Sequence, residues 1–222
     1  YVPRLFKHVH TSVCADQIRA LEVSDIGNLL CETEKASSCG SLPIELQTTK
    51  NIFALMFLLR GIPFVDLAYL RKADIQGNTL KYRRRKTGRL LTVMLTPDAI
   101  KLIRIVAKTK PESPYLFPFL SSPEGTEAAY HEYQSSLRMF NYRLSRLKKY
   151  MKTAAHLSSY TIRHTWATMA YYCEIHPGII SEAMGHSSIK VTETYLKPFQ
   201  NEKIDNANSQ VISYVKEYAS IV

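Results

Sequence analysis

The hydrophobic pattern of this chain is dominated by apolar residues that recur every three or four positions, the period of a helix with one buried face. Four segments show this period: 15–30, 97–107, 137–151 and 201–222. A fifth segment, from Ile52 to Leu59, is apolar on nearly all sides, so we expect a helix buried in the core. Thr48 or Thr49 can cap the start of this helix, and Gly61 can end it.

The period changes between residues 74 and 95, where the pattern is typical of strands. Residues 79–86 partly alternate between apolar and polar, and a Thr-Gly-Arg turn and a second short strand, 90–95, follow them. This pattern predicts an antiparallel hairpin with Lys86 at a mobile tip. We therefore expect a mainly α-helical fold with a small antiparallel β-sheet, an α+β architecture.

Three short helices joined by tight turns are predicted between residues 156 and 199. A Ser-rich step precedes Tyr160, so the first of them begins there. Residues three apart share one face of a helix, so Tyr160 and Arg163 can point at the same spot. Gly185 follows the apolar run 179–184 and has the position of a helix C-cap.

The third of these helices can bring three chemically distinctive side chains together. Ser187 or Ser188 can cap it, and it carries Tyr195 towards Arg163 and His186. An arginine grips two phosphate oxygens and stays charged, and a histidine adds one more hydrogen bond. A tyrosine hydroxyl is a weak nucleophile, with a pKa of about 10, but nearby cations favour its phenolate. The combination indicates phosphate chemistry.

Charge points to the same kind of substrate. The 222 residues carry a net charge of +10, which indicates a polyanionic partner, nucleic acid first and an acidic membrane second. No apolar run approaches the roughly 18 residues of a membrane span. Residues 79–110 hold ten bases and one acid, and residues 138–152 hold six bases and no acid, as a surface that follows a DNA backbone would. The residues expected to contact DNA are Arg83, Arg85, Arg89, Arg138, Arg143, Arg146, Lys148 and Lys149.

The four cysteines show no metal-binding or disulfide pattern. Cys14, Cys31, Cys39 and Cys173 include no Cys-x-x-Cys pair. We expect reduced thiols in a cytoplasmic protein, with no zinc site. No signal peptide is visible at the start of the chain.

The motifs Arg163-His164-Thr165, Gly185-His186-Ser187-Ser188 and Tyr195, in this order, resemble the C-terminal motifs of the tyrosine recombinases, the phage-integrase family. The resemblance covers about residues 45–200. It implies a mainly helical catalytic domain with a small sheet. It also implies site-specific exchange of DNA strands through a 3′-phosphotyrosine, with no metal or nucleotide as cofactor.

The resemblance implies a role for each matching residue. Tyr195 would attack the scissile phosphate, Arg163 would grip its non-bridging oxygens, and His186 would add a hydrogen bond. Lys86, in a Lys-Thr-Gly context as in the family, would protonate the leaving 5′ oxygen. Tyr160 stands where the family most often has His, and a phenol can donate a hydrogen bond but is a poor base near neutral pH.

The first catalytic arginine of the family has no match at the usual spacing. The stretch 70–75 and Asp66 match the family, but the usual arginine position is occupied here by Pro63. Arg60, at the end of the buried helix, is our prediction for this role; it could instead cap that helix or pair with Asp66. Asp66 and His164 are expected to support the catalytic residues from behind.

The predicted organisation is a linker at residues 1–13, a catalytic domain at 14–200 and a helical tail at 201–222. The N-terminal core-binding domain of the family is expected to be absent from this chain. The expected partners are double-stranded DNA and further copies of the chain, assembled as a tetramer on DNA through the tail. Two alternatives stay open: a type IB topoisomerase-like enzyme that nicks and closes strands, and a DNA-binding module without activity.

Overall fold

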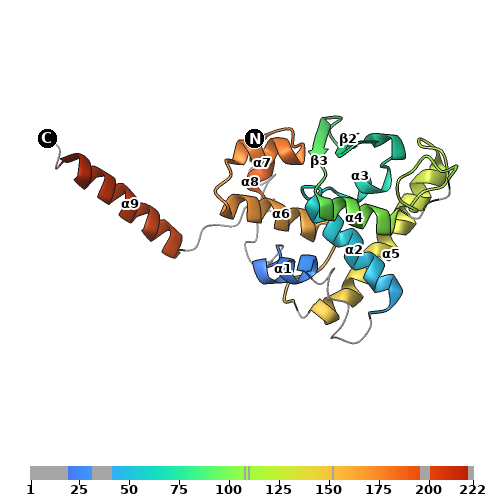
Figure 1. Ribbon diagram of the computed structural model, residues 1–222, viewed down its shortest axis with the longest axis horizontal. Coiled ribbons are helices and arrows are strands. Elements are labelled where there is room, and N and C mark those ends of the chain that lie inside the picture. Colours follow the sequence, from blue (N-terminus) through green and yellow to red (C-terminus); the bar gives the residue numbers. More distant parts are fainter. Residues whose placement is uncertain are drawn as a thin grey trace, which may run out of the picture.

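The computed structural model describes residues 20–31, 42–107, 109, 111–151, 153–195 and 201–219. Over these residues the chain is mostly helical, with one small sheet (Figure 1). The linker predicted at residues 1–13, Cys14 and Cys39 lie outside the described residues. The helices are α1 (Val23–Cys31), α2 (Ile44–Leu58), α3 (Phe64–Ala68), α4 (Pro97–Val106), α5 (Glu127–Met151), α6 (Thr161–Tyr172), α7 (Pro177–Met184), α8 (Ile189–Glu193) and α9 (Asn201–Ala219), with a 3₁₀ turn at Lys72–Asp74.

Helix α2 is the centre of the fold, as its apolar sequence predicts. Phe53, Leu55 and Met56 are fully buried, and α2 packs against α1, α4, α5 and α6. Its predicted start was wrong, because the helix begins at Ile44, directly after Pro43. Thr48 and Thr49 lie inside the helix, where their hydroxyls donate to carbonyls one turn back rather than capping it.

The chain leaves α2 through two successive left-handed residues. Arg60 has φ 61° and Gly61 has φ 67°. A side chain on Gly61 would stand 3.0 Å from Arg163 Cα and 3.2 Å from Trp166 Cβ, so glycine is needed for close packing as well as for its φ. This tight exit brings the end of α2 against the first half of α6, at Arg163 and Trp166.

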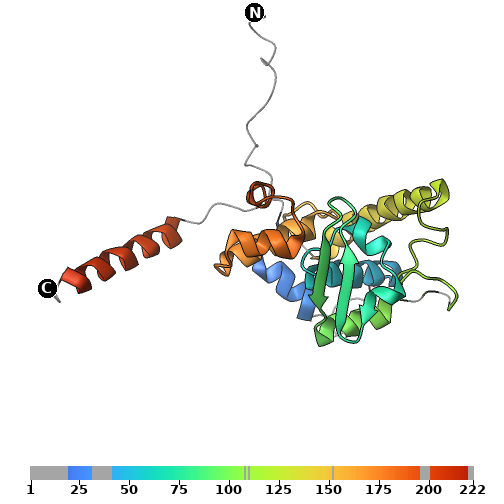
Figure 2. The same cartoon turned by 90° about the horizontal axis from the view of Figure 1, so that it is seen from above.

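The predicted sheet is confirmed. Strands β1 (Ile75–Gln76), β2 (Thr79–Arg83) and β3 (Leu90–Met94) pair in the order β1-β2-β3, all antiparallel. Leu80, Tyr82, Leu91 and Val93 face the core, and the residues between them are exposed, as a strand period of two requires. In both views the sheet lies between α3 and the group formed by α6, α7 and α8 (Figures 1 and 2).

The remaining helices largely follow their predicted periods. Helix α4 begins after Thr96, whose Oγ1 accepts a hydrogen bond from the Ala99 amide. Helix α5 starts at Glu127, ten residues before its predicted stripe, and buries Phe140, Leu144 and Leu147. Helix α9 extends away from the body (Figure 2). The structure describes no helix that is long and apolar enough to cross a membrane.

Candidate active site

Helices α6, α7 and α8 form as predicted and gather the expected side chains. Tyr160 is the N-cap residue of α6, and Gly185 ends α7 in the left-handed conformation, with φ 67°. Ser188 precedes α8 but makes no side-chain cap, and α8 ends two residues before Tyr195. The predicted helix boundary at Tyr195 was therefore too late, although the turn still places Tyr195 in the cluster.

Arg163 lies at the bottom of this cluster, with only 1% of its surface exposed. Its Nη1 donates to the Gly61 carbonyl at 2.9 Å, and its Nη2 donates to the Met184 carbonyl at 2.8 Å and contacts His186 Nε2 at 2.8 Å. Burial, followed by the charge of Arg84, lowers the pKa of this guanidinium. Its Nε–H is buried and has no hydrogen-bond partner among the described residues.

Both ring nitrogens of His186 lie within hydrogen-bond distance of another side chain. Nε2 faces the Arg163 guanidinium, and Nδ1 lies 2.8 Å from Thr192 Oγ1. Burial lowers the pKa of the imidazole to about 4, and the charges of Arg163, Arg84 and Lys86 add to this shift. The ring is therefore neutral at physiological pH.

Tyr195 lies close to Arg163 and His186, among other aromatic rings. Its hydroxyl lies 3.1 Å from the hydroxyl of Tyr160. Its ring centroid is 4.5 Å from that of His164 and 5.1 Å from that of His186. Burial raises the pKa of Tyr195, the hydrogen bond to Tyr160 raises it further, and Arg163 opposes both.

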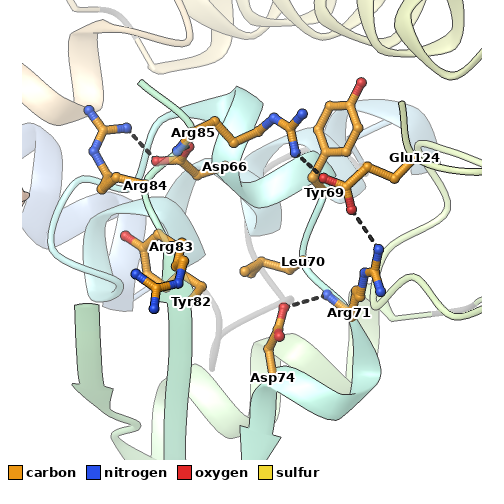
Figure 3. A pocket seen from close by; sticks show the side chains of 10 residues that line it. All are labelled: Asp66, Tyr69, Leu70, Arg71, Asp74, Tyr82, Arg83, Arg84, Arg85 and Glu124. Atoms are coloured by element: carbon orange, nitrogen blue, oxygen red, sulfur yellow. Dashed lines mark hydrogen bonds and ion pairs between the residues drawn. The ribbon is translucent and has the colours of Figure 1, made fainter. Parts of the chain in front are cut away.

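The structure adds an arginine that our sequence prediction missed. Arg84 is 4% exposed and forms an ion pair with the buried carboxylate of Asp66, and no described residue accepts a hydrogen bond from its buried Nε–H. It also borders the α7–α8 turn, because a Cβ on Gly185 would stand 2.7 Å from Arg84 Cγ. Figure 3 shows Arg84 and Asp66 joined at the edge of a pocket.

The signal for Arg84 was present in the sequence. Leu80 and Tyr82 point into the core, so a period of two puts residue 84 on the same side, whereas its neighbours Arg83 and Arg85 are exposed. Asp66 also needed a cation once it was buried. Its partner is Arg84, so the alternative pairing of Arg60 with Asp66 was wrong.

Arg60 lies near this cluster but at its margin. It is half-buried, and its charge lowers the pKa of the Tyr82 phenol, as do those of Arg84 and Arg163, although burial raises that pKa overall. The charges that act on His186 are those of Arg163, Arg84 and Lys86. The structure therefore offers two arginines, Arg60 and Arg84, for one expected role.

The hairpin that carries Lys86 is fastened to the α7–α8 turn. Thr87 Oγ1 donates to the Gly185 carbonyl at 3.1 Å, and Arg89 Nη1 donates to the His186 carbonyl at 2.9 Å. Lys86 itself is exposed, directly before the first of these two anchors. Instead of the free tip we predicted, the hairpin is tied to the turn that holds His186.

The basic residues predicted to contact DNA fall into two groups. In the hairpin, Arg85 stacks on the ring of Tyr69 at 3.7 Å and pairs with Glu124, which Arg71 also contacts (Figure 3). On α5, the residues stand on the outer face of the helix. Arg138, Arg146 and Lys149 are exposed, Arg143 and Lys148 are half-buried, and both Arg143 and Arg146 lie 3.8 Å from Glu45.

Comparison with solved structures defines the class of fold. The XerA recombinase aligns with a TM-score of 0.60 at 15% identity, over 90% of this chain and 66% of that one. The XerH site-specific recombinase, in a post-cleavage complex with a palindromic difH substrate, aligns at 0.57 and 16%, over 86% of this chain and 52% of that one. The Tn1549 transposon integrase, in complex with transposon right end DNA, aligns at 0.56 and 13%, over 87% and 66%.

These matches show a tyrosine recombinase catalytic-domain fold, and this chain spans about half to two-thirds of the chains it matches. Residues 23–202 also match the model of the Phage integrase family. The chain belongs to that family. No curated protein sequence matches it.

Proposed function

We propose that this chain is the catalytic part of a site-specific recombinase that cuts and rejoins DNA through a 3′-phosphotyrosine. One observation carries the proposal: close to the α7–α8 turn, two buried arginines, Arg84 and Arg163, each keep an Nε–H that has no hydrogen-bond partner in the described part of the chain. Buried donors are nearly always satisfied in folded proteins. An anion that enters beside Tyr195 would satisfy both, and a phosphodiester has the required charge and geometry.

The reaction that we propose balances without an added cofactor. The Tyr195 oxygen attacks phosphorus and gives its proton to water, and the bond from phosphorus to the 5′ oxygen breaks. Lys86 gives its proton to that leaving oxygen. The phosphodiester bond is exchanged for a phosphotyrosine ester, so the reverse attack by a 5′ hydroxyl rejoins the strand without ATP. Metal independence is part of this proposal.

The surrounding groups stabilise the charge that develops on the phosphate. Arg163 and either Arg84 or Arg60 would contact the non-bridging oxygens, and donors fixed in advance cost no reorganisation during the reaction. Tyr160 already contacts the hydroxyl of Tyr195. In the complex, Tyr160 would donate to the phosphate when Tyr195 turns to attack.

Helix α9 supports the proposal that copies assemble on DNA. Ile204, Val211, Ile212 and Val215 are all exposed along it. Lys203 ties the start of the helix to the body through the Tyr172 carbonyl and Glu174. An apolar stripe of this length is typical of a surface that is covered in the assembled state. We infer a neighbouring protomer of the tetramer as the cover.

Covalent trapping tests the proposed function. The chain is incubated with a pool of duplexes of random sequence, each nicked so that the short 5′-hydroxyl fragment diffuses away after cleavage. We expect a protein–DNA adduct that resists SDS and disappears with protease. Tyr195→Phe should form none, whereas Tyr130→Phe, a change at an exposed tyrosine in the first turn of α5, should form as much as wild type.

Three results would contradict parts of the proposal. Adducts that persist in Tyr195→Phe would remove Tyr195 as the nucleophile. If the chain binds DNA but forms no adduct, the chain is a DNA-binding module without cleavage activity. Relaxation of a supercoiled plasmid that lacks a preferred adduct site would favour the topoisomerase-like alternative.

A further inference from the structure

The hydrogen bonds around His186 fix which of its nitrogens carries the proton. An arginine guanidinium has donors and no acceptor. Arg163 Nη2 lies 2.8 Å from Nε2, so Nε2 must be the acceptor and the single proton of the neutral ring must be on Nδ1. The Nδ1–H then donates to Thr192 Oγ1, 2.8 Å away.

Thr192 is the one buried residue of α8. It is 0% exposed, whereas residues 187–191 on the approach to it and along the helix are exposed. An apolar residue would be expected at the single buried position of a short helix. A hydroxyl there has a specific use, because it supplies the only acceptor that the structure places against His186 Nδ1 among the described residues.

The chain of contacts continues to the guanidinium. Both protons of Arg163 Nη2 are committed, one to the Met184 carbonyl and one to His186 Nε2, and Nη1 donates to the Gly61 carbonyl. The guanidinium is therefore held by three hydrogen bonds through three of its five N–H groups, and its buried Nε–H has no hydrogen-bond partner among the described residues. If the His186 proton moved to Nε2, two N–H groups would face each other and Arg163 would no longer be held by the imidazole.

We propose that Thr192 is a positioning residue that keeps His186 in its Nδ1–H form and thereby fixes the Arg163 guanidinium for phosphate binding. The inference rests on the proposed function for the role of Arg163. The Thr192 carbonyl accepts a hydrogen bond from the Tyr195 amide at 2.9 Å, a main-chain contact that side-chain substitutions keep. The proposed role belongs to the Thr192 hydroxyl, which acts through the imidazole.

Two substitutions of similar size separate the hydroxyl from its packing. Thr192→Val keeps the shape and removes the acceptor, and Thr192→Ser keeps the acceptor and removes a methyl group. Thr194→Val is the matched control, because Thr194 is exposed two residues further on and donates only to the Val191 carbonyl. The signals of His186 are assigned in ¹⁵N-histidine-labelled chain by their loss in His186→Asn.

Two measurements then decide the proposal. Two-bond ¹H–¹⁵N spectra should show His186 protonated on Nδ1 in wild type, Thr192→Ser and Thr194→Val, and mixed or Nε2-protonated in Thr192→Val. Adduct formation should fall about tenfold in Thr192→Val alone, the lower end of the worth of the charged hydrogen bond between Arg163 and His186 that the tautomer change removes.

Either of two results would overturn the proposal. One is an Nε2–H proton in wild type, and the other is an Nδ1–H form that survives in Thr192→Val. Equal losses of activity in Thr192→Val and Thr192→Ser would also reject it and leave a packing role only. The spectra require no cleavage, so a wild-type chain that forms no adduct would refute the proposed function without deciding the tautomer.

Discussion

Arginines appear in two contrasting settings in this molecule. Arg84 and Arg163 are almost fully buried, whereas Arg138 and Arg146 stand exposed on the outer face of α5. The buried pair is held by specific partners: the Asp66 carboxylate for Arg84, and main-chain carbonyls and His186 for Arg163. On α5, by contrast, Arg143 and Arg146 share one carboxylate, that of Glu45, at 3.8 Å.

The difference in burial separates two uses of the same positive charge. Burying a guanidinium is costly unless its donors are matched, so each buried arginine is fixed in direction before any substrate arrives. A fixed donor in a dry site can stabilise a transition state. Exposed arginines are solvated and mobile, and they contribute to DNA affinity through counterion release, with little preference for one geometry.

Lys86 is the strongest test of this division between buried and exposed cations, because it is exposed and we nonetheless expect it to be catalytic. Lys86→Ala should slow cleavage by roughly 10²- to 10⁴-fold, the usual range for a general acid. Single-turnover adduct formation measures the rate. A duplex with a 5′-thio leaving group needs little acid, so it should restore the rate of Lys86→Ala.

Tyr160→Phe is the control for that rescue. It removes the hydroxyl 3.1 Å from the Tyr195 hydroxyl and should slow cleavage by roughly 10- to 150-fold, the worth of one hydrogen bond to a charged group. The thio substrate should not restore it. Rescue of both variants would put Tyr160 on the path of the proton, and rescue of neither would reject Lys86 as the acid.

Either Arg84 or Arg60 would hold the phosphate together with Arg163, and two substitutions distinguish them. Arg84→Lys keeps the charge opposite Asp66 but loses the fork, and it should slow adduct formation by roughly 10²- to 10³-fold. Arg60→Gly removes the other candidate while favouring the left-handed backbone at that position. We expect its rate to stay within a few fold of wild type.

The reverse ranking would decide for Arg60, the arginine that the sequence suggested. Thermal unfolding of both variants separates a loss of catalysis from a loss of fold, because breaking a buried ion pair is strongly destabilising. A folded Arg84→Lys chain that cleaves at the wild-type rate would place Arg84 in a purely structural role.

The free energy of unfolding should depend on pH through His186, whose pKa is lowered by burial and by the positive charges around it. Its pKa is about 4 in the folded chain and about 6.5 when unfolded. As pH falls from 7.5 to 5, the unfolded chain takes up a proton that the folded chain does not, so stability falls, by about 2 kcal/mol. Urea titrations at several pH values measure this slope.

His186→Asn is the reference for that slope, since it removes the titrating group whatever its effect on absolute stability. The pH dependence should flatten between pH 5 and 7.5 in this variant. The window stops at pH 5 because Glu132, whose pKa is lowered to about 2 by hydrogen bonds from Ser121 and Ser122 that outweigh its burial, loses its own contribution below about pH 4.5. An unchanged slope would show that His186 titrates normally.

These contrasts also show what the sequence could and could not predict. Local period was enough for most of the helices, for the hairpin and for the meeting of Arg163 and His186 with Tyr195, but the short helix α3 was not predicted. Arg84 was missed because it stands in a run of three arginines, where only the alternation of the strand decides which one points inwards. The start of α2 was misplaced because the Pro43 backbone, rather than a threonine side chain, leads into the helix.

Other features need contacts that no local pattern contains. The pairing of Asp66 with Arg84 joins residues 18 positions apart, and the hydrogen bonds of Thr87 and Arg89 to the α7–α8 turn span almost 100 residues. Whether His186 donates or accepts follows only from the positions of Arg163 and Thr192. The resemblance implied that His186 adds a hydrogen bond to the phosphate, whereas in the structure its Nε2 lies 2.8 Å from the Arg163 guanidinium, which can only donate.

The smallest effects are expected on the exposed side of the comparison, at the outer face of α5. Arg138→Gln and Lys149→Gln should each weaken binding to random-sequence duplex only a few fold at moderate salt. The loss should be the same for every sequence, and the dependence of log affinity on log salt should soften by about one unit for each phosphate interaction that a substitution removes. Fluorescence anisotropy over a series of salt concentrations measures both quantities.

The arginines near Glu45 allow a substitution with the opposite expected effect on DNA binding. Arg146 lies 3.8 Å from the Glu45 carboxylate, which competes with DNA for the same guanidinium. Glu45→Gln should therefore strengthen binding slightly, since it releases Arg146 and removes one negative charge from the surface. Cleavage per bound complex should not change in any of these variants, because affinity alone is altered. A variant of α5 that changed the cleavage rate at saturating DNA would mean that the exposed arginines, too, are fixed for chemistry, and the division between the two settings would fail.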